Sequence, residues 1–236
     1  EDIDTRISDV FAKMNYEVDL SNEKGRLRSL SFNCIYGTDA NPRMARTAKM
    51  NMIMHGDGHG GVHHHDGLLN VNGIWDGRFD VILTNPPFGA RVDKDSIITE
   101  ADKFTDDVKI KAYVKRYGEE YLTALKQVNN HIGEPLLNQF EVGKMSALTE
   151  VLFIDRCLNL LKPGGRLGIV LPEGVLNNTN LQNVREYFEG RAKILLIVSI
   201  PQEVFMAAGA TVKPSLMFFK RFTEEEQIQY DTIKRD

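Results

Sequence analysis

The chain has 236 residues and a mass of 26.7 kDa, which is enough for one α/β domain with a sizeable core. Its hydrophobic content of 42% is ordinary for a globular protein, and no apolar run approaches the roughly 18 residues that a membrane span needs. The formal net charge is -4, whereas a free-standing DNA-binding protein usually carries a basic excess. Any grip on DNA must therefore be local or come from a partner.

The two cysteines, Cys34 and Cys157, both lie in apolar segments. Isolated thiols in such surroundings are typical of buried cysteines in a reducing compartment and not of a disulfide framework. We therefore expect both thiols to be buried and the protein to be cytoplasmic.

The first 42 residues predict a helix, a strand and the start of a second helix. Residues 1–20 carry apolar side chains at helical spacing, and Asn33 to Thr38 are apolar enough for a strand. Pro42 stands where the second helix would begin. Asp39, between them, can accept hydrogen bonds from both hydroxyls of a ribose, or Asp39 or Asn41 can merely cap the helix. The residues alone favour the cap.

Five of the six histidines fall within residues 55–65. A metal site is one interpretation, but no Cys or Glu lies nearby, and neighbours in a strand point to opposite faces. A glycine-rich loop that enters a short strand near Val62 to His65 is the better interpretation, with no metal. Asp66 then ends the strand as a turn residue before Gly67. Trp75, the only tryptophan, is expected to pack against neighbours.

The most informative stretch runs from Asp80 to Gly89, where an apolar run meets a polar residue, two prolines and an aromatic ring. Val81 to Leu83 predict a short buried strand. Pro86 and Pro87 cannot continue a sheet, because they lack an N–H and fix φ. The strand should therefore end at Asn85, with a stiff loop at its carboxyl end, where open α/β sheets bind ligands.

The loop predicts a site for a planar group that carries an exocyclic amine. Asn85 supplies a side-chain carbonyl, Pro86 a backbone carbonyl, and Phe88 an aromatic face. When both amine hydrogens are accepted, the nitrogen lone pair is localised and the amine becomes a better nucleophile. A plain Pro-Pro turn after a strand is the alternative interpretation.

The remainder of the chain predicts alternating helices and strands. Residues 90–145 are charged on one face and contain an aromatic stripe (Tyr113, Tyr117, Tyr121), which indicates a helix that packs in the core. Further elements are predicted as helices at 146–161, 181–188 and 223–236, strands at 166–171 and 216–219, a buried parallel strand at 194–200, and a flexible loop at 205–211.

Several strings, in order along the chain, resemble a known family. Asn85-Pro86-Pro87-Phe88 matches the Asn-Pro-Pro-aromatic motif of the amino-methylating, S-adenosylmethionine-dependent DNA methyltransferases. The other strings resemble the modification subunit of type I restriction–modification systems. They are Tyr36 to Pro42, Ala48 to Met52 with His55-Gly56, Leu161 to Arg166, Val170 to Leu176 and Val212 to Ser215.

The resemblance implies a Rossmann-like α/β methyltransferase sheet and methyl transfer from S-adenosylmethionine to the N6 amine of adenine in DNA. It implies that Asn85, Pro86, Pro87 and Phe88 act on a flipped base. It also implies that Asp39, with Ala40 beside it, binds the cofactor ribose, and that Asp66 and Gly67 lie at its adenine. No metal is implied. A specificity subunit would read the DNA, and a restriction nuclease subunit can join it.

One feature departs from the family pattern. These families carry a glycine-rich turn after the first strand, but in residues 1–38 Gly25 stands singly among charged residues and Gly37 is the only other glycine. We therefore expect residues 1–236 to be a fragment of a single methyltransferase catalytic domain, incomplete at its amino terminus, with an insertion or lid at about 90–145. The alternatives are an N5-glutamine protein methyltransferase, which uses a similar loop, and a non-catalytic assembly subunit that keeps only the fold.

Overall fold

A computed structural model of the chain describes residues 29–30, 33–55, 61–206 and 212–235. The chain divides into two compact units, Glu1–Ile74 and Trp75–Asp236, and each is described by itself. The predicted helix within residues 1–20 lies outside the described residues, as does most of the predicted loop at 205–211. None of the described helices is both long and apolar enough to cross a lipid bilayer.

The first unit contains two short parallel strands, β1 (Gly37–Asp39) and β2 (Val62–His64), joined through helix α4 (Pro42–Met54). The helix begins where the sequence predicts, with Pro42 in its first turn and the Asn41 side chain accepting from the backbone N–H groups of Arg43 and Met44. The strand predicted at 33–38 begins only at Gly37.

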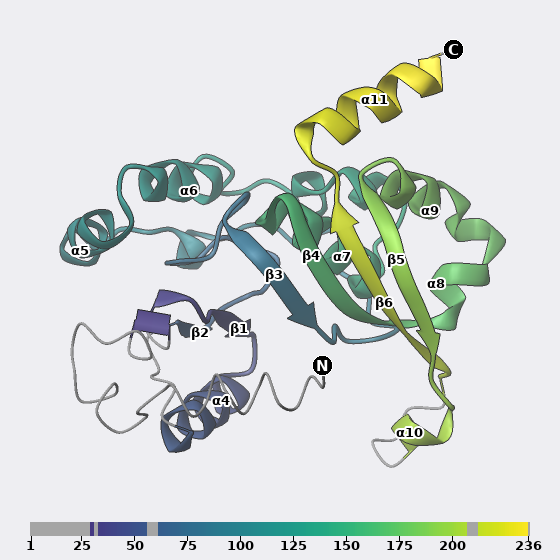
Figure 1. Cartoon of the computed structure of the whole chain (residues 1–236). Helices are drawn as coiled ribbons and strands as arrows, with labels where there is room; N and C mark the ends of the chain where they lie inside the picture. Colours follow the sequence, from purple (N-terminus) through teal and green to yellow (C-terminus); the bar gives the residue numbers. More distant parts are fainter. Residues whose placement is uncertain (1–28, 31–32, 56–60, 207–211, 236) are drawn as a thin grey trace, which may run out of the picture. The chain divides into compact units, whose positions relative to one another are not determined.

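The second unit is built on a mixed sheet of four strands in the order β3-β4-β6-β5. Their bounds are β3 Phe79–Thr84, β4 Leu161–Pro172, β5 Ala192–Ser199 and β6 Pro214–Arg221. Strand β4 is parallel to β3, and β6 is antiparallel to both β4 and β5. In Figure 1 the arrows of β3 and β5 accordingly point to one edge of the sheet and that of β6 to the other.

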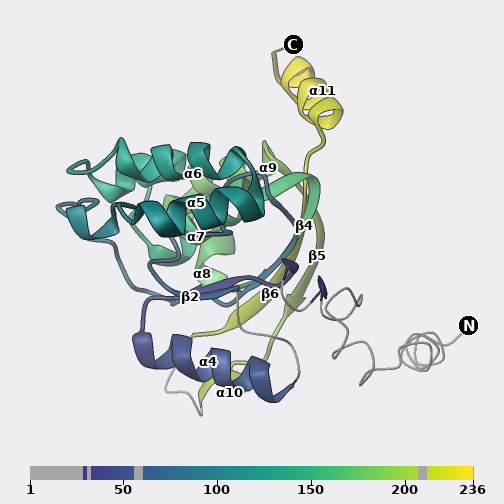
Figure 2. The same ribbon diagram turned by 90° about the vertical axis from the view of Figure 1, so that its left-hand side faces the viewer.

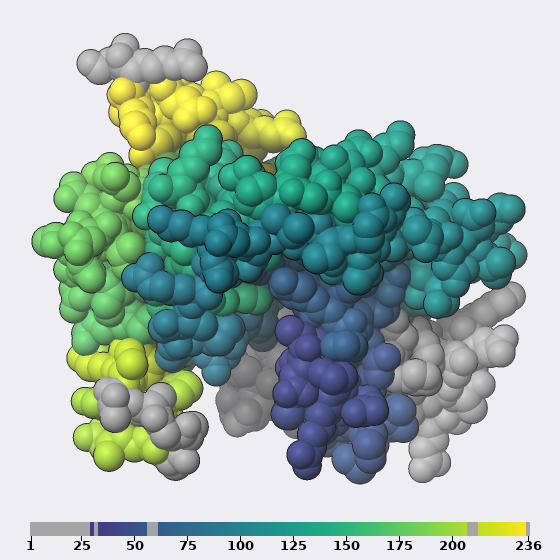
Figure 3. All heavy atoms as spheres, turned by 180° about the vertical axis from the view of Figure 1, so that it is seen from behind, coloured from purple at the N-terminus to yellow at the C-terminus, as the bar shows by residue number. Residues whose placement is uncertain are grey.

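Helices accompany this sheet along the chain. They are α5 (Asp107–Tyr117), α6 (Glu120–Asn129), α7 (Thr149–Leu160), α8 (Glu173–Asn177), α9 (Gln182–Glu189), α10 (Glu203–Met206) and α11 (Glu224–Arg235). Short 3-10 turns lie at Glu100–Asp102, Leu136–Gln139, Glu141–Lys144 and Thr179–Leu181. Helices α5 to α9 lie on the same side of the sheet (Figure 2), and from behind the teal and green atoms of this part of the chain cover the sheet (Figure 3).

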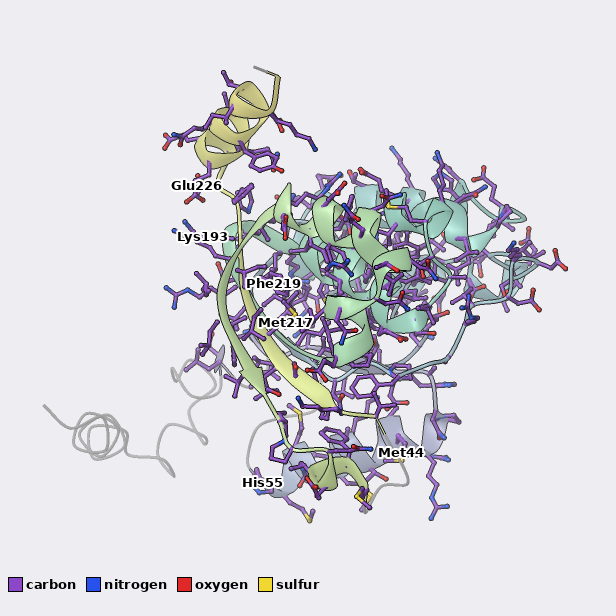
Figure 4. The ribbon with its side chains drawn as sticks, turned by 90° about the vertical axis from the view of Figure 1, so that its right-hand side faces the viewer. Met44, His55, Lys193, Met217, Phe219 and Glu226 are labelled. Carbon is purple, nitrogen blue, oxygen red and sulfur yellow. The ribbon has the colours of Figure 1, made fainter. Side chains whose placement is uncertain are left out.

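The core of the second unit lies between the sheet and this helical layer. Met217 and Phe219 of β6 are buried there, as are Leu152 and Ile154 of α7. An edge-on view places Met217 and Phe219 on the helical side and Lys193 on the opposite side of the sheet (Figure 4). Beyond the sheet, Lys220 pairs with Glu226 at the start of α11.

The prediction that residues 194–200 form a buried parallel strand is wrong. Strand β5 pairs only with β6 among the described strands, runs antiparallel to it and is exposed along most of its length. The expected burial of β3 is also wrong, since Val81 is 60% and Leu83 77% exposed. Both strands lie at the edges of the described sheet. An apolar run predicts a strand but not the number of neighbours that the strand will have.

Two further expectations need correction. Cys34 is exposed, and only Cys157 is buried, where burial raises the thiol pKa to about 12.

The aromatic stripe does not lie on one helix, because Gly118, with φ of 80°, ends α5 before α6 begins. The stripe does pack in a core as predicted. Tyr121 and Trp75 are both buried, and Tyr113 and Tyr117 pack against them.

Candidate active-site loop and carboxylate pair

The loop Asn85–Phe88 leaves the sheet at the carboxyl end of β3, as the sequence predicts. Thr84 is the last residue of β3 and lies opposite Ile169 of β4. Beyond it, the side chain of Asn85 is exposed, Pro86 is buried, and Phe88 is half-buried. The buried proline anchors the loop, while Asn85 remains open to a ligand.

A second aromatic ring lies beside Phe88. The ring centroid of Phe205, in α10, is 6.2 Å from that of Phe88, and the two planes are tilted by 42°. The sequence predicts a flexible loop here and gives Phe205 no role in the site. One feature of the sequence could have indicated that role: Phe205 follows β5, which ends at the same edge of the sheet as β3.

Other polar groups gather at this edge. Glu173 follows β4, Lys213 precedes β6, and their side chains form an ion pair of 3.1 Å. The backbone N–H of Glu173 also donates to the carbonyl of Lys213. Ser215, which follows in β6, is buried and cannot reach solvent. The edge therefore presents the Asn85–Phe88 loop, Phe205 and one paired lysine.

The far end of the loop is tied to the start of α7. The backbone N–H of Gly89 donates to the Glu150 carboxylate, at 3.2 and 3.3 Å from its two oxygens. The Thr149 N–H donates to the carbonyl of Ala90 at 2.9 Å. The sequence prediction missed this contact of Glu150, because apolar residues at helical spacing surround it.

In the first unit, Asp39 ends β1 and is exposed. One of its oxygens accepts from the backbone N–H of Asn41 at 2.7 Å, while Asn41 itself caps α4. The carbonyl of Ala40 lies 3.1 Å from Nε2 of His64. Asp39 thus stabilises the turn into α4 with one oxygen, and the exposed carboxylate can still accept from a ligand through the other.

Asp66 follows β2 by two residues and is half-buried. Its carboxylate accepts from the N–H of Leu68, and its carbonyl accepts from the N–H of Leu69, so Asp66 forms the turn expected around Gly67. Because β1 and β2 are parallel, with Asp39 opposite His64, the carboxylates of Asp39 and Asp66 follow the same edge of this small sheet. The two expected cofactor ligands therefore follow neighbouring strands at one edge of this small sheet.

The histidines near this edge make local hydrogen bonds. His63 Nδ1 lies 3.0 Å from the Asn72 amide, and His65 Nδ1 lies 3.0 Å from the carbonyl of Asp66. In the described part of the chain, which omits His59, no three His, Cys, Asp or Glu side chains are grouped as metal ligands.

The mixed sheet, with an antiparallel strand between β4 and β5 and polar loops at its carboxyl edge, together with the family match places the chain in the class of α/β methyltransferase folds. Within this class the model of the N-6 DNA methylase family matches residues 21–117 and 137–234. The chain belongs to this family.

Similar proteins come from type I restriction enzymes. The methylase subunit of EcoEI from Escherichia coli is 23% identical over 198 residues, which cover 83% of this chain and 32% of that subunit. A chain of a type I R-M system is 26% identical with a TM-score of 0.58, over 82% of this chain and 32% of the other. The M protein of EcoKI, at 18% identity, shares the fold with a TM-score of 0.57, over 94% and 36%. The chain thus spans about a third of the length of these relatives.

Proposed function

We propose that these residues form the catalytic part of a site-specific DNA methyltransferase, which transfers a methyl group from S-adenosylmethionine to the N6 amine of adenine as part of a type I modification subunit. The observation that carries the proposal is the Asn85–Phe88 loop. It combines an exposed amide, a buried proline and an aromatic ring at the carboxyl edge of β3. Membership of the N-6 DNA methylase family supports the same activity.

The loop residues have separate roles in this proposal. The Asn85 side-chain carbonyl and the Pro86 backbone carbonyl accept the two hydrogens of the adenine amine. Phe88 stacks on the base, which must leave the duplex to reach it. Pro87 keeps the loop rigid, so that the acceptors are preorganised before the base arrives.

Asp39 and Asp66 are the proposed ligands of S-adenosylmethionine, which supplies a sulfonium methyl group when bound. The chemistry of the two groups fits this role. An exposed carboxylate at a strand end can accept from ribose hydroxyls, and a half-buried one beside two buried leucines suits the amine and ring of an adenine. Ala40 and Gly67 would line the same site through their backbones.

We further propose that residues 1–236 are a fragment of one catalytic domain, in which residues 90–145 form an insertion or lid. Because the net charge is -4, we propose that a separate specificity subunit makes most of the contacts that bind DNA. A restriction nuclease subunit is the other proposed partner.

The test of the function is the substitution Asn85→Ala. The variant is produced in the source cells and purified together with the subunits that accompany the protein. Loss of one amine acceptor in a preorganised site should lower kcat for adenine methylation by about 100-fold or more. Asn183→Ala, which removes an exposed amide on α9, is the matched control and should leave methylation unchanged. Unchanged DNA methylation by Asn85→Ala would exclude the catalytic role.

The choice of substrate separates the proposal from its rival. An N5-glutamine protein methyltransferase would label a glutamine-containing peptide and not an adenine-containing duplex. Radiolabelled methyl transfer to each substrate, measured side by side, distinguishes the two. Transfer to neither would favour a non-catalytic assembly subunit.

A further inference from the structure

Glu150 is buried, with 3% of its surface exposed, in the first turn of α7. Both oxygens of its carboxylate face the backbone N–H of Gly89, a residue 61 positions earlier in the chain. Among the ion pairs of the described residues, none involves Glu150. The structure thus directs a buried carboxylate at one backbone N–H that follows the Asn85–Phe88 loop directly.

Burial of a carboxylate without a cation costs free energy unless hydrogen bonds and dipoles compensate for it. Two features of the structure do so. The N–H of Gly89 donates to the carboxylate, and the position of Glu150 in the first turn of α7 sets its charge beside the positive end of the helix dipole. The loop end and the helix start therefore stabilise each other through Glu150.

Backbone contacts continue this connection past Gly89. The Thr149 N–H donates to the Ala90 carbonyl, and the Val92 N–H donates to the Ala147 carbonyl, both at 2.9 Å. An isolated bridge pairs Arg91 with Leu148. The segment after the loop is therefore held along the residues that lead into α7, and the Glu150 carboxylate is the contact nearest the loop.

Gly89 adopts φ of 69°, in the left-handed region, directly after Phe88. Pro86 and Pro87 restrict the loop before Phe88, and the bond to Glu150 fixes the peptide after it. We propose that Glu150 is a positioning residue, which orients Phe88 and the acceptors of the loop through the N–H of Gly89. This inference rests on the proposed function for its effect on catalysis, although the contact itself does not.

The first test is hydrogen exchange of a peptide that spans residues 84–92. Pro86 and Pro87 contribute no amide, so Gly89 is one of few reporters in this peptide. Glu150→Ala should raise amide exchange there, whereas Glu150→Gln, which keeps an acceptor at the same distance, should retain the protection. Equal exchange in Glu150→Ala and the unchanged protein would overturn the proposal. This measurement involves no methylation, so it stands or fails independently of the proposed function.

The second test is kinetic and uses the assembly purified from source cells. Glu150→Ala should lower kcat for adenine methylation by about 10- to 100-fold, because small misplacements of catalytic groups have effects of this size. The KM for DNA should change by less than about threefold, since the contacts that bind the duplex remain. Glu150→Gln should restore most of kcat.

Asp155→Ala is the matched control, because Asp155 is another buried carboxylate on α7 but bonds to Asn159, Tyr187 and Val142 instead of the loop. It should lower Tm with little change in kcat per folded enzyme. A Glu150→Ala variant that behaves in the same way, or a Glu150→Gln variant as slow as Glu150→Ala, would overturn the positioning role. An unchanged protein that fails to methylate adenine would instead overturn the proposed function.

Discussion

At the scale of single residues, Phe88 gives a prediction that Asn85 does not. Stacking of a base on an aromatic ring contributes about 1–3 kcal/mol, so Phe88→Ala should lower kcat/KM for adenine methylation by about 5- to 150-fold. Phe88→Tyr keeps the ring face and should stay close to the unchanged protein. The measurement is steady-state methylation of a duplex that carries the target site.

The present contact between Phe88 and Phe205 adds a condition to this prediction. Centroids 6.2 Å apart are typical of two rings in direct contact, so the rings leave no room for a base between them. A base stacked between both rings therefore requires Phe205 to move. Equal activity of Phe88→Ala and the unchanged protein would remove the stacking role altogether.

The site residues also differ in how far the sequence could predict them. Asn85 to Phe88 are neighbours in the chain, and the order of polar residue, prolines and aromatic ring specifies the loop locally. Glu150 has no such signal, because its burial depends on Gly89, 61 residues away. Helical spacing would place Glu150 on a solvent-facing side. Tertiary contacts of this kind leave no periodic pattern in a sequence.

At the scale of elements, a buried hydrogen-bond network joins α7 to α9. Asp155 of α7 is fully buried and accepts from the Tyr187 hydroxyl of α9 at 2.7 Å, from Asn159 at 3.0 Å and from the N–H of Val142 at 3.3 Å. Burial raises the pKa of Asp155, and the bond from Tyr187 acts in the opposite direction. The network therefore favours the charged carboxylate against the cost of its burial.

Tyr187→Phe should consequently lower the free energy of unfolding by about 1.5–3 kcal/mol at neutral pH, since it removes a hydrogen bond to a charged group. Loss of the hydroxyl bond also raises the pKa of Asp155 in the folded variant above its pKa in the unchanged protein. The loss of stability is therefore fully present at a pH above the pKa in the variant. It fades as the pH falls through that pKa, because the Asp155 carboxyl group then becomes protonated in the variant and, at lower pH, in the unchanged protein as well. Urea unfolding at neutral and acidic pH measures this.

Tyr230→Phe is a suitable control for that experiment, because Tyr230 lies on α11 and its ring contacts Phe222, away from the buried carboxylate of the network. Its effect should not depend on pH. A loss of stability in Tyr187→Phe that is the same at every pH would show that the hydroxyl bond does not act through the charge of Asp155.

The elements themselves divide by the kind of signal that specifies them. Helix α4 begins after the predicted cap Asn41, and strand β3 ends at Thr84, one residue before the predicted end at Asn85 and just ahead of the two prolines. The sequence predicts β5 as a strand, but as a buried parallel one, whereas it pairs antiparallel with β6 at the edge of the sheet. Its direction and edge position depend on β6, which is inserted between β4 and β5 and follows both in the chain.

At the scale of the whole molecule, one group of exposed apolar side chains lies on the sheet of the second unit. Val81 and Leu83 of β3 and Leu196 of β5 are each more than half exposed. The side chains of Leu83 and Phe218 both lie against Gly168, and an added Cβ there would come within 2.7 Å of Leu83. This face is therefore continuous across β3, β4 and β6, while the opposite face is covered by helices.

The whole chain also sets how well the proposed cofactor site can bind. Residues 1–236 supply Asp39 and Asp66, but the sequence of residues 1–38 contains no glycine-rich stretch of the kind whose backbone N–H groups could approach the methionine part of the cofactor. We expect these 236 residues to bind S-adenosylmethionine with a Kd weaker than about 100 μM, because they lack the contacts that a glycine-rich turn would make to the cofactor. Each loss of about 1.4 kcal/mol in contacts weakens the affinity tenfold. Isothermal calorimetry measures this Kd directly.

Asp39→Ala should abolish the remaining heat of binding if the ribose contact is correct. A micromolar Kd for the unchanged chain would show that the two carboxylates and their neighbours suffice, and that the glycine-rich turn is not required here.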